Sequence, residues 1–210
     1  IPGIRYDFYP ELDYNGAAIP ELFDYNFNNT TRFNGDPSLR LTTRYEFKPK
    51  HTAKIALGNY NQSPRPIGQA IHPRWGNPDL GVTRAAHYVV GYEWQMTDLL
   101  SLDIQGYVNR QWNVARENDF TQRSSELFVD DGKKRMHGIE FMLRQDQSEH
   151  FFGWVSYSLS RSQYWNYSEK IWNLTGKDQT HNLIMVGSWK LPKNFETGFK
   201  LQFATGDPST

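Results

Sequence analysis

The connections between the apolar segments of this chain alternate between short and long, and this alternation constrains the fold more than any other feature. Four pairs of strand-like segments are each joined by a short turn, and roughly twenty irregular residues separate one pair from the next. Long connections without secondary structure are uncommon inside one compact domain. Transmembrane β-barrels, in contrast, have short turns at one membrane surface and longer loops at the other. The alternation therefore predicts a β-barrel that spans a membrane.

A period of two in the apolar residues predicts the strands themselves. The predicted strands cover residues 4–9, 38–47, 52–61, 84–96, 99–112, 135–144, 151–161, 182–191 and 195–205. The long connections between the hairpins cover residues 62–83, 113–134 and 162–181. The expected fold class is all-β, an antiparallel up-and-down transmembrane β-barrel of which this chain supplies about nine strands.

The predicted strands have one face that carries almost no charge. In the segment 99–112, Leu102, Ile104 and Val108 alternate with the polar residues Asp103 and Gln105. Successive residues of a strand point to opposite faces of the sheet, so this segment has one apolar face and one polar face. Hydrocarbon does not tolerate charge on the face that it contacts. The apolar rows are therefore expected to face lipid, and the polar rows are expected to face a lumen.

Arg110 is the exception, because it lies on the apolar row of the segment 99–112. At about 3.3 Å per residue and a strand tilt near 40°, the climb from Leu100 to Arg110 is roughly 25 Å. Arg110 is thus predicted to lie at the far membrane interface. A cation costs about 0 to 1 kcal/mol there, compared with about 2 to 4 kcal/mol at the midplane.

These strands are predicted to be part of a larger barrel. Bacterial single-chain barrels have an even number of strands, and nine are found here. The polar rows carry many charged residues, including Arg44, Lys54, Glu93 and Asp103, which the packed interior of an eight-stranded barrel would not readily pair. A wide lumen that is wet or plugged fits these charges better. Residues 1–210 are accordingly expected to form one partial barrel domain.

Several short motifs resemble the barrel of TonB-dependent outer-membrane receptors. They occur in order at residues 58–64, 76–80, 84–88, 137–140, 153–160, 178–181 and 203–208. The resemblance implies a barrel of about 22 strands with an N-terminal plug domain in its lumen. It also implies an outer-membrane receptor of a Gram-negative bacterium, which takes energy from the TonB complex through an N-terminal box and imports a scarce solute such as a metal chelate. No plug domain or TonB box is recognisable, so the chain is expected to be the middle-to-late part of such a barrel.

The sequence offers little support for catalysis, for a cofactor or for nucleic-acid binding. The chain has no cysteine, and its formal net charge is zero, which gives no reason to expect nucleic acid. Its six histidines lack the spacing of metal ligands. No nucleophile elbow, P-loop or dinucleotide fingerprint is present. We therefore expect no catalytic residue, no bound metal and no cofactor, and we expect outer-membrane lipid as a partner.

Two of the long connections are candidates for solute binding. They combine aromatic and cationic side chains, namely Arg65, His72, Arg74 and Trp75 in one and Tyr164, Trp165, Tyr167, Lys170 and Trp172 in the other. Rings and cations together can hold a sugar, a catecholate or an aromatic chelate by stacking and charge. The same rings can pack one loop against another, and the sequence leaves both roles open.

Other protein classes explain part of the pattern. A soluble, secreted β-sandwich that acts as a carbohydrate-binding module would account for the aromatic residues, although it gives no reason for short turns at one end only. A receptor-like barrel that acts as a structural partner in an outer-membrane assembly is a second alternative. An outer-membrane barrel enzyme would need a nucleophile, a base and an orienting group at one rim, and no convincing set is present.

Overall fold

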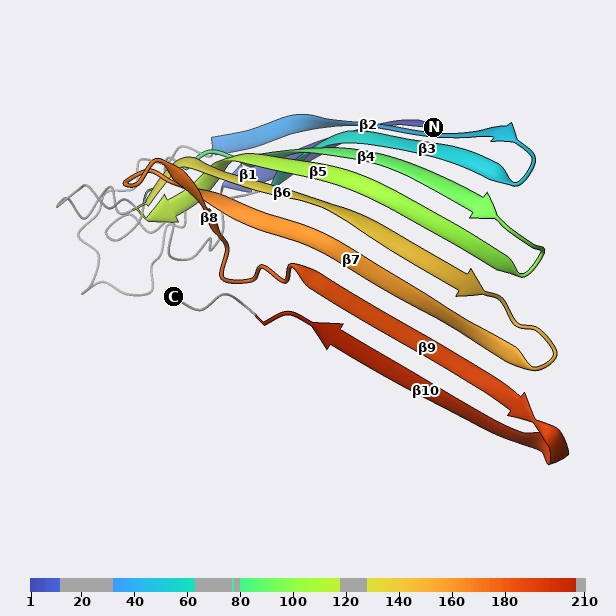
Figure 1. Ribbon diagram of the computed structural model, residues 1–210. Helices are drawn as coiled ribbons and strands as arrows, with labels where there is room; N and C mark the ends of the chain where they lie inside the picture. Colours follow the sequence, from blue (N-terminus) through green and yellow to red (C-terminus); the bar gives the residue numbers. More distant parts are fainter. Residues whose placement is uncertain (12–31, 63–76, 78–79, 118–127, 207–210) are drawn as a thin grey trace, which may run out of the picture.

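The computed structural model describes residues 1–11, 32–62, 77, 80–117 and 128–206 (Figure 1). They form β1 (Pro2–Glu11), β2 (Arg32–Lys48), β3 (His51–Gln62), β4 (Thr83–Gln95), β5 (Leu100–Glu117), β6 (Phe128–Gln145), β7 (Phe151–Asn166), β8 (Ile171–Leu174), β9 (His181–Leu191), the 3₁₀ turn η2 (Pro192–Asn194) and β10 (Phe195–Ala204). No helix among them is long and apolar enough to cross a membrane, a finding that does not bear on β-barrels.

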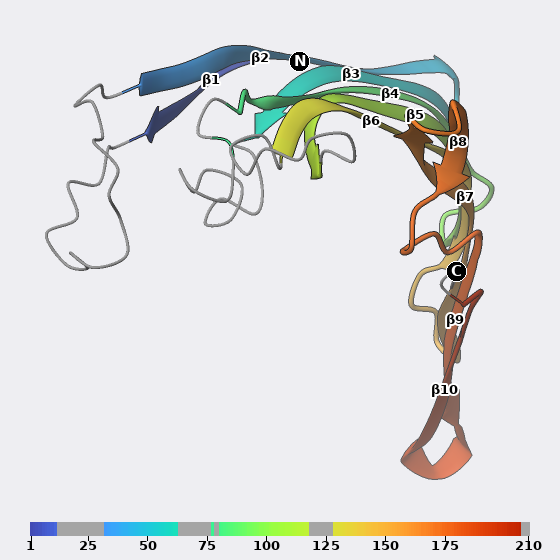
Figure 2. The same cartoon turned by 90° about the vertical axis from the view of Figure 1, so that its left-hand side faces the viewer.

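All of these strands belong to one antiparallel sheet. The strands pair in the order β1-β2-β3-β4-β5-β6-β7-β9-β10, and the short strand β8 pairs only with β7. Every pair is antiparallel, so the predicted up-and-down order is confirmed. The sheet curves as an open arc, with β1 and β10 at its two edges (Figure 2).

The tight turns lie together at one end of the sheet (Figure 1). They connect β2 to β3, β4 to β5, β6 to β7 and β9 to β10. Short-range contacts close them: the Thr97 hydroxyl accepts the Leu100 N–H at 3.0 Å, and the Ser148 hydroxyl accepts the Phe151 N–H at 3.0 Å. Lys50 and Lys193 adopt positive φ angles of 68° and 64°, which reverse the chain within very few residues. Side chains and local backbone conformation thus set the short turns.

At the opposite end, several strands extend beyond their predicted limits. β5 and β6 each have 18 residues, whereas the alternation predicted 99–112 and 135–144. Their register shifts between Gln111 and Val114, where Asn113 has a φ of 54°, and pairing then resumes. Such a bulge moves the following side chains relative to the sheet faces, so the period of two is lost while backbone pairing continues.

The described residues form ten strands, one more than the nine that were predicted. The segment 162–181 was predicted to be one irregular connection, but β7 continues through Asn166 and β8 folds back on it. Trp165 pairs with Trp172 in this extension. Pairing over so few residues leaves no recognisable alternation in the sequence, which explains why β8 was missed.

The strand register places the apolar rows of neighbouring strands side by side. Ile104 lies between Tyr92 on β4 and Phe141 on β6, and the rows continue in this way across the sheet. We call the side of the sheet that carries Ile104 and these neighbours the apolar face, and the opposite side the polar face.

None of the described residues packs over the apolar face. Val90 is 63% exposed and Phe203 is 56% exposed, although both belong to apolar rows. Within the described part of the chain, the only buried apolar residues are Leu80 and Val82. The fold therefore presents its apolar side chains outward instead of packing them into a core.

Two glycines on the apolar face have opposite surroundings. A Cβ atom at Gly153 would lie 2.7 Å from the Val186 carbonyl oxygen and 2.6 Å from the Phe151 ring, whereas a Cβ at Gly106 would meet nothing within 4 Å. Gly153→Ala should therefore lower the free energy of unfolding by about 1 to 3 kcal/mol through overpacking. Gly106→Ala should change it by no more than about 0.5 kcal/mol or raise it slightly.

Thermal unfolding of the two purified variants, followed by far-ultraviolet circular dichroism, measures this difference. The substitution is the same in both variants and both positions lie inside strands of one face. Equal losses of stability in the two variants would contradict the strand pairing around Gly153.

Candidate functional site

Charged side chains from four strands converge on the polar face. The Lys54 ammonium group on β3 lies 2.7 Å from a Glu93 carboxylate oxygen on β4 and also contacts the Asp103 carboxylate on β5. Arg44 on β2 contacts the same Glu93 oxygen at 3.0 Å. Two cations and two carboxylates therefore balance each other. The side chains of Lys54, Glu93 and Asp103 are 23%, 29% and 24% exposed, so the network is partly shielded from solvent.

Further along the polar face, toward the end of the sheet opposite the tight turns, a cation–π contact and an aromatic pair take the place of the ion-pair network. The Arg40 guanidinium lies 4.5 Å from the centre of the Tyr60 ring, and the Tyr60 and His87 rings are 4.4 Å apart. Asn109 helps to line a small cavity of about 60 Å³ together with Ser162. The Asn109 Oδ1 atom is buried there without a hydrogen-bond partner. This part of the polar face therefore offers rings and an acceptor to a bound molecule.

The hairpin formed by β7 and β8 carries an aromatic cluster. The Trp165 and Trp172 rings meet edge to face at 5.4 Å, and Tyr167 meets Trp165 edge to face at 6.5 Å. The guanidinium of Arg135 lies 4.3 Å from the Trp172 ring, and that of Arg116 lies 4.3 Å from the Tyr167 ring. Cation–π contacts of this kind contribute about 0.5 to 1 kcal/mol each at exposed sites.

An ion pair joins the ends of β5 and β6, and a hydrogen bond from Tyr167 ties the hairpin to them. Arg116 binds Asp131 through two bonds, Nε to Oδ1 at 2.6 Å and Nη2 to Oδ2 at 3.0 Å. The Tyr167 hydroxyl donates a hydrogen bond to the Asp131 carbonyl oxygen. Burial and the nearby Asp131 carboxylate raise the pKa of the Tyr167 hydroxyl, so it stays protonated and can donate throughout the neutral range. Three segments that are separate in sequence are thus held together.

The structure therefore brings together part of the predicted binding set. Tyr164, Trp165, Tyr167 and Trp172 all lie on the β7–β8 hairpin, and Lys170 occupies its turn with a φ of 55°. By strand alternation Tyr164 continues the polar face, while Trp165 and Trp172 continue the apolar face. The other predicted residues, Arg65, His72, Arg74 and Trp75, lie outside the described residues.

The partners that hold the hairpin in place could not be recognised in the sequence. Arg116 belongs to a segment that was predicted to be irregular, and Arg135 was only the first residue of a predicted strand. Asp131 lies 36 residues from its partner Tyr167. A charged residue beside an aromatic loop is too common in sequences to identify such contacts without the strand register.

The polar motif at residues 178–181 has a structural role. Asp178 is 3% exposed, and its carboxylate accepts the Ser162 N–H at 2.5 Å and the Thr180 hydroxyl at 2.9 Å. These bonds satisfy one backbone N–H of β7 and one hydroxyl next to the start of β9. Across the described part of the chain, no three His, Cys, Asp or Glu side chains are grouped so that they could hold a metal ion.

Comparisons with known proteins identify the fold. No family model matches the sequence, and no curated protein matches it. Several solved structures match it in fold, among them an import receptor and an iron transporter. The ferric-catecholate import receptor Fiu from Escherichia coli K12, in its closed form, is 16% identical with a TM-score of 0.70. The FrpB iron transporter from Neisseria meningitidis, F3-3 variant, is 12% identical with a TM-score of 0.69.

The alignments cover almost all of this chain but only part of the matched proteins. They include 96% of this chain with Fiu and 95% with FrpB, but 31% and 29% of those proteins. The chain thus spans about a third of the length of the structures that it matches. Its fold is that of part of the barrel of a TonB-dependent receptor, as the motif resemblance predicted.

The contact between Arg116 and Asp131 is expected to control the order of the hairpin end. Asp131→Asn removes the charge that Arg116 binds at two points, and it should speed amide hydrogen exchange at residues 114–117, 128–132 and 167–170 by roughly 3- to 10-fold, equivalent to about 1 kcal/mol. Asp98→Asn is the matched control, because the Lys50–Asp98 pair has side chains that are 51% and 94% exposed. Exchange should not change around Asp98. If both substitutions have the same local effect, the Arg116 contact does not order the hairpin.

Proposed function

We propose that this chain forms part of the barrel wall of a TonB-dependent outer-membrane receptor, which imports a scarce solute such as a metal chelate. The observation that carries the proposal is a long antiparallel sheet whose apolar face is uncovered while its polar face carries balanced charges. The two matched structures support it, since they are an import receptor and an iron transporter.

In this proposal the apolar face contacts lipid and the polar face lines a lumen. Water would not favour rows of exposed side chains such as Ile55, Val90 and Leu201, which are 45%, 63% and 46% exposed. Lipid hydrocarbon stabilises the same rows. A soluble β-sandwich would instead bury the apolar face against a second sheet. The described residues form one sheet, so this alternative finds no support in the fold.

The proposed barrel includes more strands than those described here. β1 and β10 are edges of the described sheet, and an open edge in hydrocarbon would leave backbone N–H and C=O groups without partners at several kcal/mol each. Closure therefore requires additional strands next to both edges. A barrel of about 22 strands, with a plug domain in its lumen and a TonB contact, is the form that the resemblance implies.

We further propose that the solute contacts the aromatic hairpin and the part of the polar face around Tyr60, His87 and Asn109. Tyr164 is the best placed of the predicted residues, because it continues the polar face and is 38% exposed. Trp165, Tyr167 and Trp172 shape the hairpin through their mutual contacts. An aromatic ring can stack on a planar chelate at a gain of about 0.5 to 1.5 kcal/mol beyond the area that it buries. Fiu is a ferric-catecholate import receptor, so ferric catecholates are the first class of solute to test.

Uptake in cells tests the proposed transport. Deletion of the gene for the whole protein should abolish high-affinity uptake of its solute, with radioactive ferric catecholates as the first probes. Dissipation of the proton gradient across the inner membrane should abolish the same uptake in the parent strain. Unchanged uptake of every chelate tested, together with loss of an outer-membrane complex, would contradict transport and favour the structural partner.

The role of Tyr164 has a more local test. Tyr164→Ala should weaken solute binding to the purified whole receptor by about 3- to 10-fold, because a stacking contact of about 1 kcal/mol is lost. Tyr45→Ala is the control, since Tyr45 is 65% exposed and its strand position places it on the apolar face. Isothermal titration calorimetry measures both. Equal affinities for Tyr164→Ala and the unaltered receptor would exclude Tyr164 from the binding site.

A further inference from the structure

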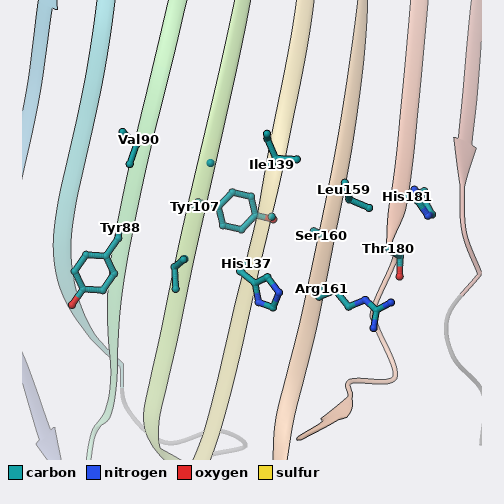
Figure 3. A pocket seen from close by; sticks show the side chains of 13 residues that line it. Tyr88, Val90, Tyr107, His137, Ile139, Leu159, Ser160, Arg161, Thr180 and His181 are labelled. Atoms are coloured by element: carbon teal, nitrogen blue, oxygen red, sulfur yellow. The ribbon is translucent and has the colours of Figure 1, made fainter.

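Basic side chains gather on the apolar face where its apolar rows end. Arg110 on β5 pairs directly with Arg135 on β6, and His137 on β6 pairs directly with Arg161 on β7. All four continue the rows of Ile104, Ile139 and Leu159 by strand alternation. We call Arg110, Arg135, His137 and Arg161 the basic belt. Figure 3 shows His137 and Arg161 side by side on their neighbouring strands.

No carboxylate in the described part of the chain forms an ion pair with the basic belt. Arg135 instead donates to the Gln163 side-chain oxygen at 2.8 Å and rests on the Trp172 ring. Like charges that face each other directly across two strands destabilise a sheet, by roughly 0.2 to 1 kcal/mol for such a pair. A bound anion between Arg110 and Arg135 would relieve this repulsion.

An apolar groove lies directly next to the basic belt. It has a volume of about 800 Å³ and opens onto the apolar face. Gly106 contributes no side chain, and the space above it is empty to 4 Å. Figure 3 shows Tyr88 and Val90 on one side of the groove and Leu159 on the other. His137 and Arg161 belong both to the lining of this groove and to the basic belt, so the apolar and cationic parts are continuous.

We propose that the basic belt and this groove together bind one membrane lipid with an anionic phosphate headgroup. The phosphate oxygens lie between Arg110, Arg135 and Arg161, and one acyl chain occupies the groove above Gly106. This inference rests on the proposed function, because the lipid must lie against the apolar face of an inserted barrel.

The dimensions and chemistry of the site match such a lipid. Arg110 follows Gly106 by four residues on the same row, which corresponds to about 13 Å along the strand. A headgroup at the basic belt would thus place the upper part of its acyl chain in the groove. Guanidinium groups suit phosphate because their N–H donors form pairs of parallel hydrogen bonds with its oxygens. The negative charge of the headgroup would also reduce the repulsion between Arg110 and Arg135.

A membrane lipid explains both halves of the site at once. A soluble phosphate would satisfy the basic belt but leave the apolar groove empty. A second copy of the chain would have to present an acidic group beside an apolar side chain. A lipid with a phosphate monoester brings the negative charge and the hydrocarbon chain in one molecule, in the orientation that a membrane imposes.

Lipid retention tests the proposal on the whole protein. The receptor is reconstituted in nanodiscs that contain equal amounts of phosphatidic acid and phosphatidylcholine with identical acyl chains, and the lipids that remain bound after extraction in mild detergent are measured by native mass spectrometry. We expect at least a 5-fold preference for phosphatidic acid. The double variant Arg110→Gln, Arg135→Gln should lose this preference, and Gly106→Leu, which fills the groove, should weaken retention.

Lys200→Gln is the matched control for charge. Lys200 lies on β10 with a position on the polar face, so this variant loses a cation without changing the proposed site and should retain phosphatidic acid normally. Equal retention of the two lipids by the unaltered receptor would overturn the proposal. So would an undiminished preference in the double variant.

Thermal stability provides a second readout that does not depend on lipid extraction. Phosphatidic acid should raise the Tm of the unaltered receptor in detergent micelles, and inorganic phosphate alone should not. In phosphatidylcholine, Arg110→Gln should raise the Tm slightly because it removes the repulsion from Arg135. A Tm increase with inorganic phosphate that equals the increase with phosphatidic acid would indicate an anion site and contradict a lipid site.

The two proposals fail in distinguishable ways. Protein that inserts into vesicles but shows no preference among lipids contradicts the lipid site and leaves the receptor function intact. Protein that does not insert into any vesicle contradicts both. Insertion is followed independently, through protection of the tight turns or the long-loop end from added protease.

Discussion

Backbone pairing between neighbouring strands determines almost everything else in this structure. Apart from the short strand β8, which pairs only with β7, each strand bonds to the next in chain order, and the register keeps the apolar rows adjacent from strand to strand. A shift of one residue would move every side chain of a strand to the opposite face. Ile104 would then face the Lys54 network, and Asp103 would join the apolar rows. The separation of apolar and polar faces is therefore a property of the register, since the described residues form almost no buried core.

The alternation of apolar and polar residues predicted the sheet, because every second residue of a strand that faces lipid must be apolar. This requirement ends where the strands leave the proposed membrane. Beyond Gln111 the side chains of β5 no longer follow it, although the backbone continues to pair through Glu117. For the same reason β8 was not predicted, because it lies in a hairpin that no hydrocarbon constrains. Sequence patterns thus located the alternating part of the strands well and their distal ends poorly.

The candidate site was predicted only in part, for a related reason. The aromatic residues of the β7–β8 hairpin could be recognised from composition, but their partners Arg116 and Asp131 are brought near by strands whose ends were not predicted. The structure also divides the aromatic set, placing Tyr164 on the polar face and Trp165 on the apolar face. Arg110 is an exception in its apolar row. The register pairs it with Arg135, and this pairing is the basis of the proposed lipid site. Two isolated cations in the sequence become one cluster at the edge of an apolar groove.

The assignment of the apolar face to lipid is the claim on which the proposed function rests. This chain has no cysteine. In the whole protein, with any cysteine outside this chain replaced by serine, the substitutions Ile104→Cys and Gln105→Cys can each carry an environment-sensitive fluorophore in vesicles. These adjacent residues point to opposite faces of β5. Lipids brominated along their acyl chains should quench the probe at Ile104 strongly and the probe at Gln105 weakly, while aqueous iodide should show the reverse order. Equal quenching at both positions, or stronger lipid quenching at Gln105, would contradict a membrane-spanning wall with its apolar face toward lipid.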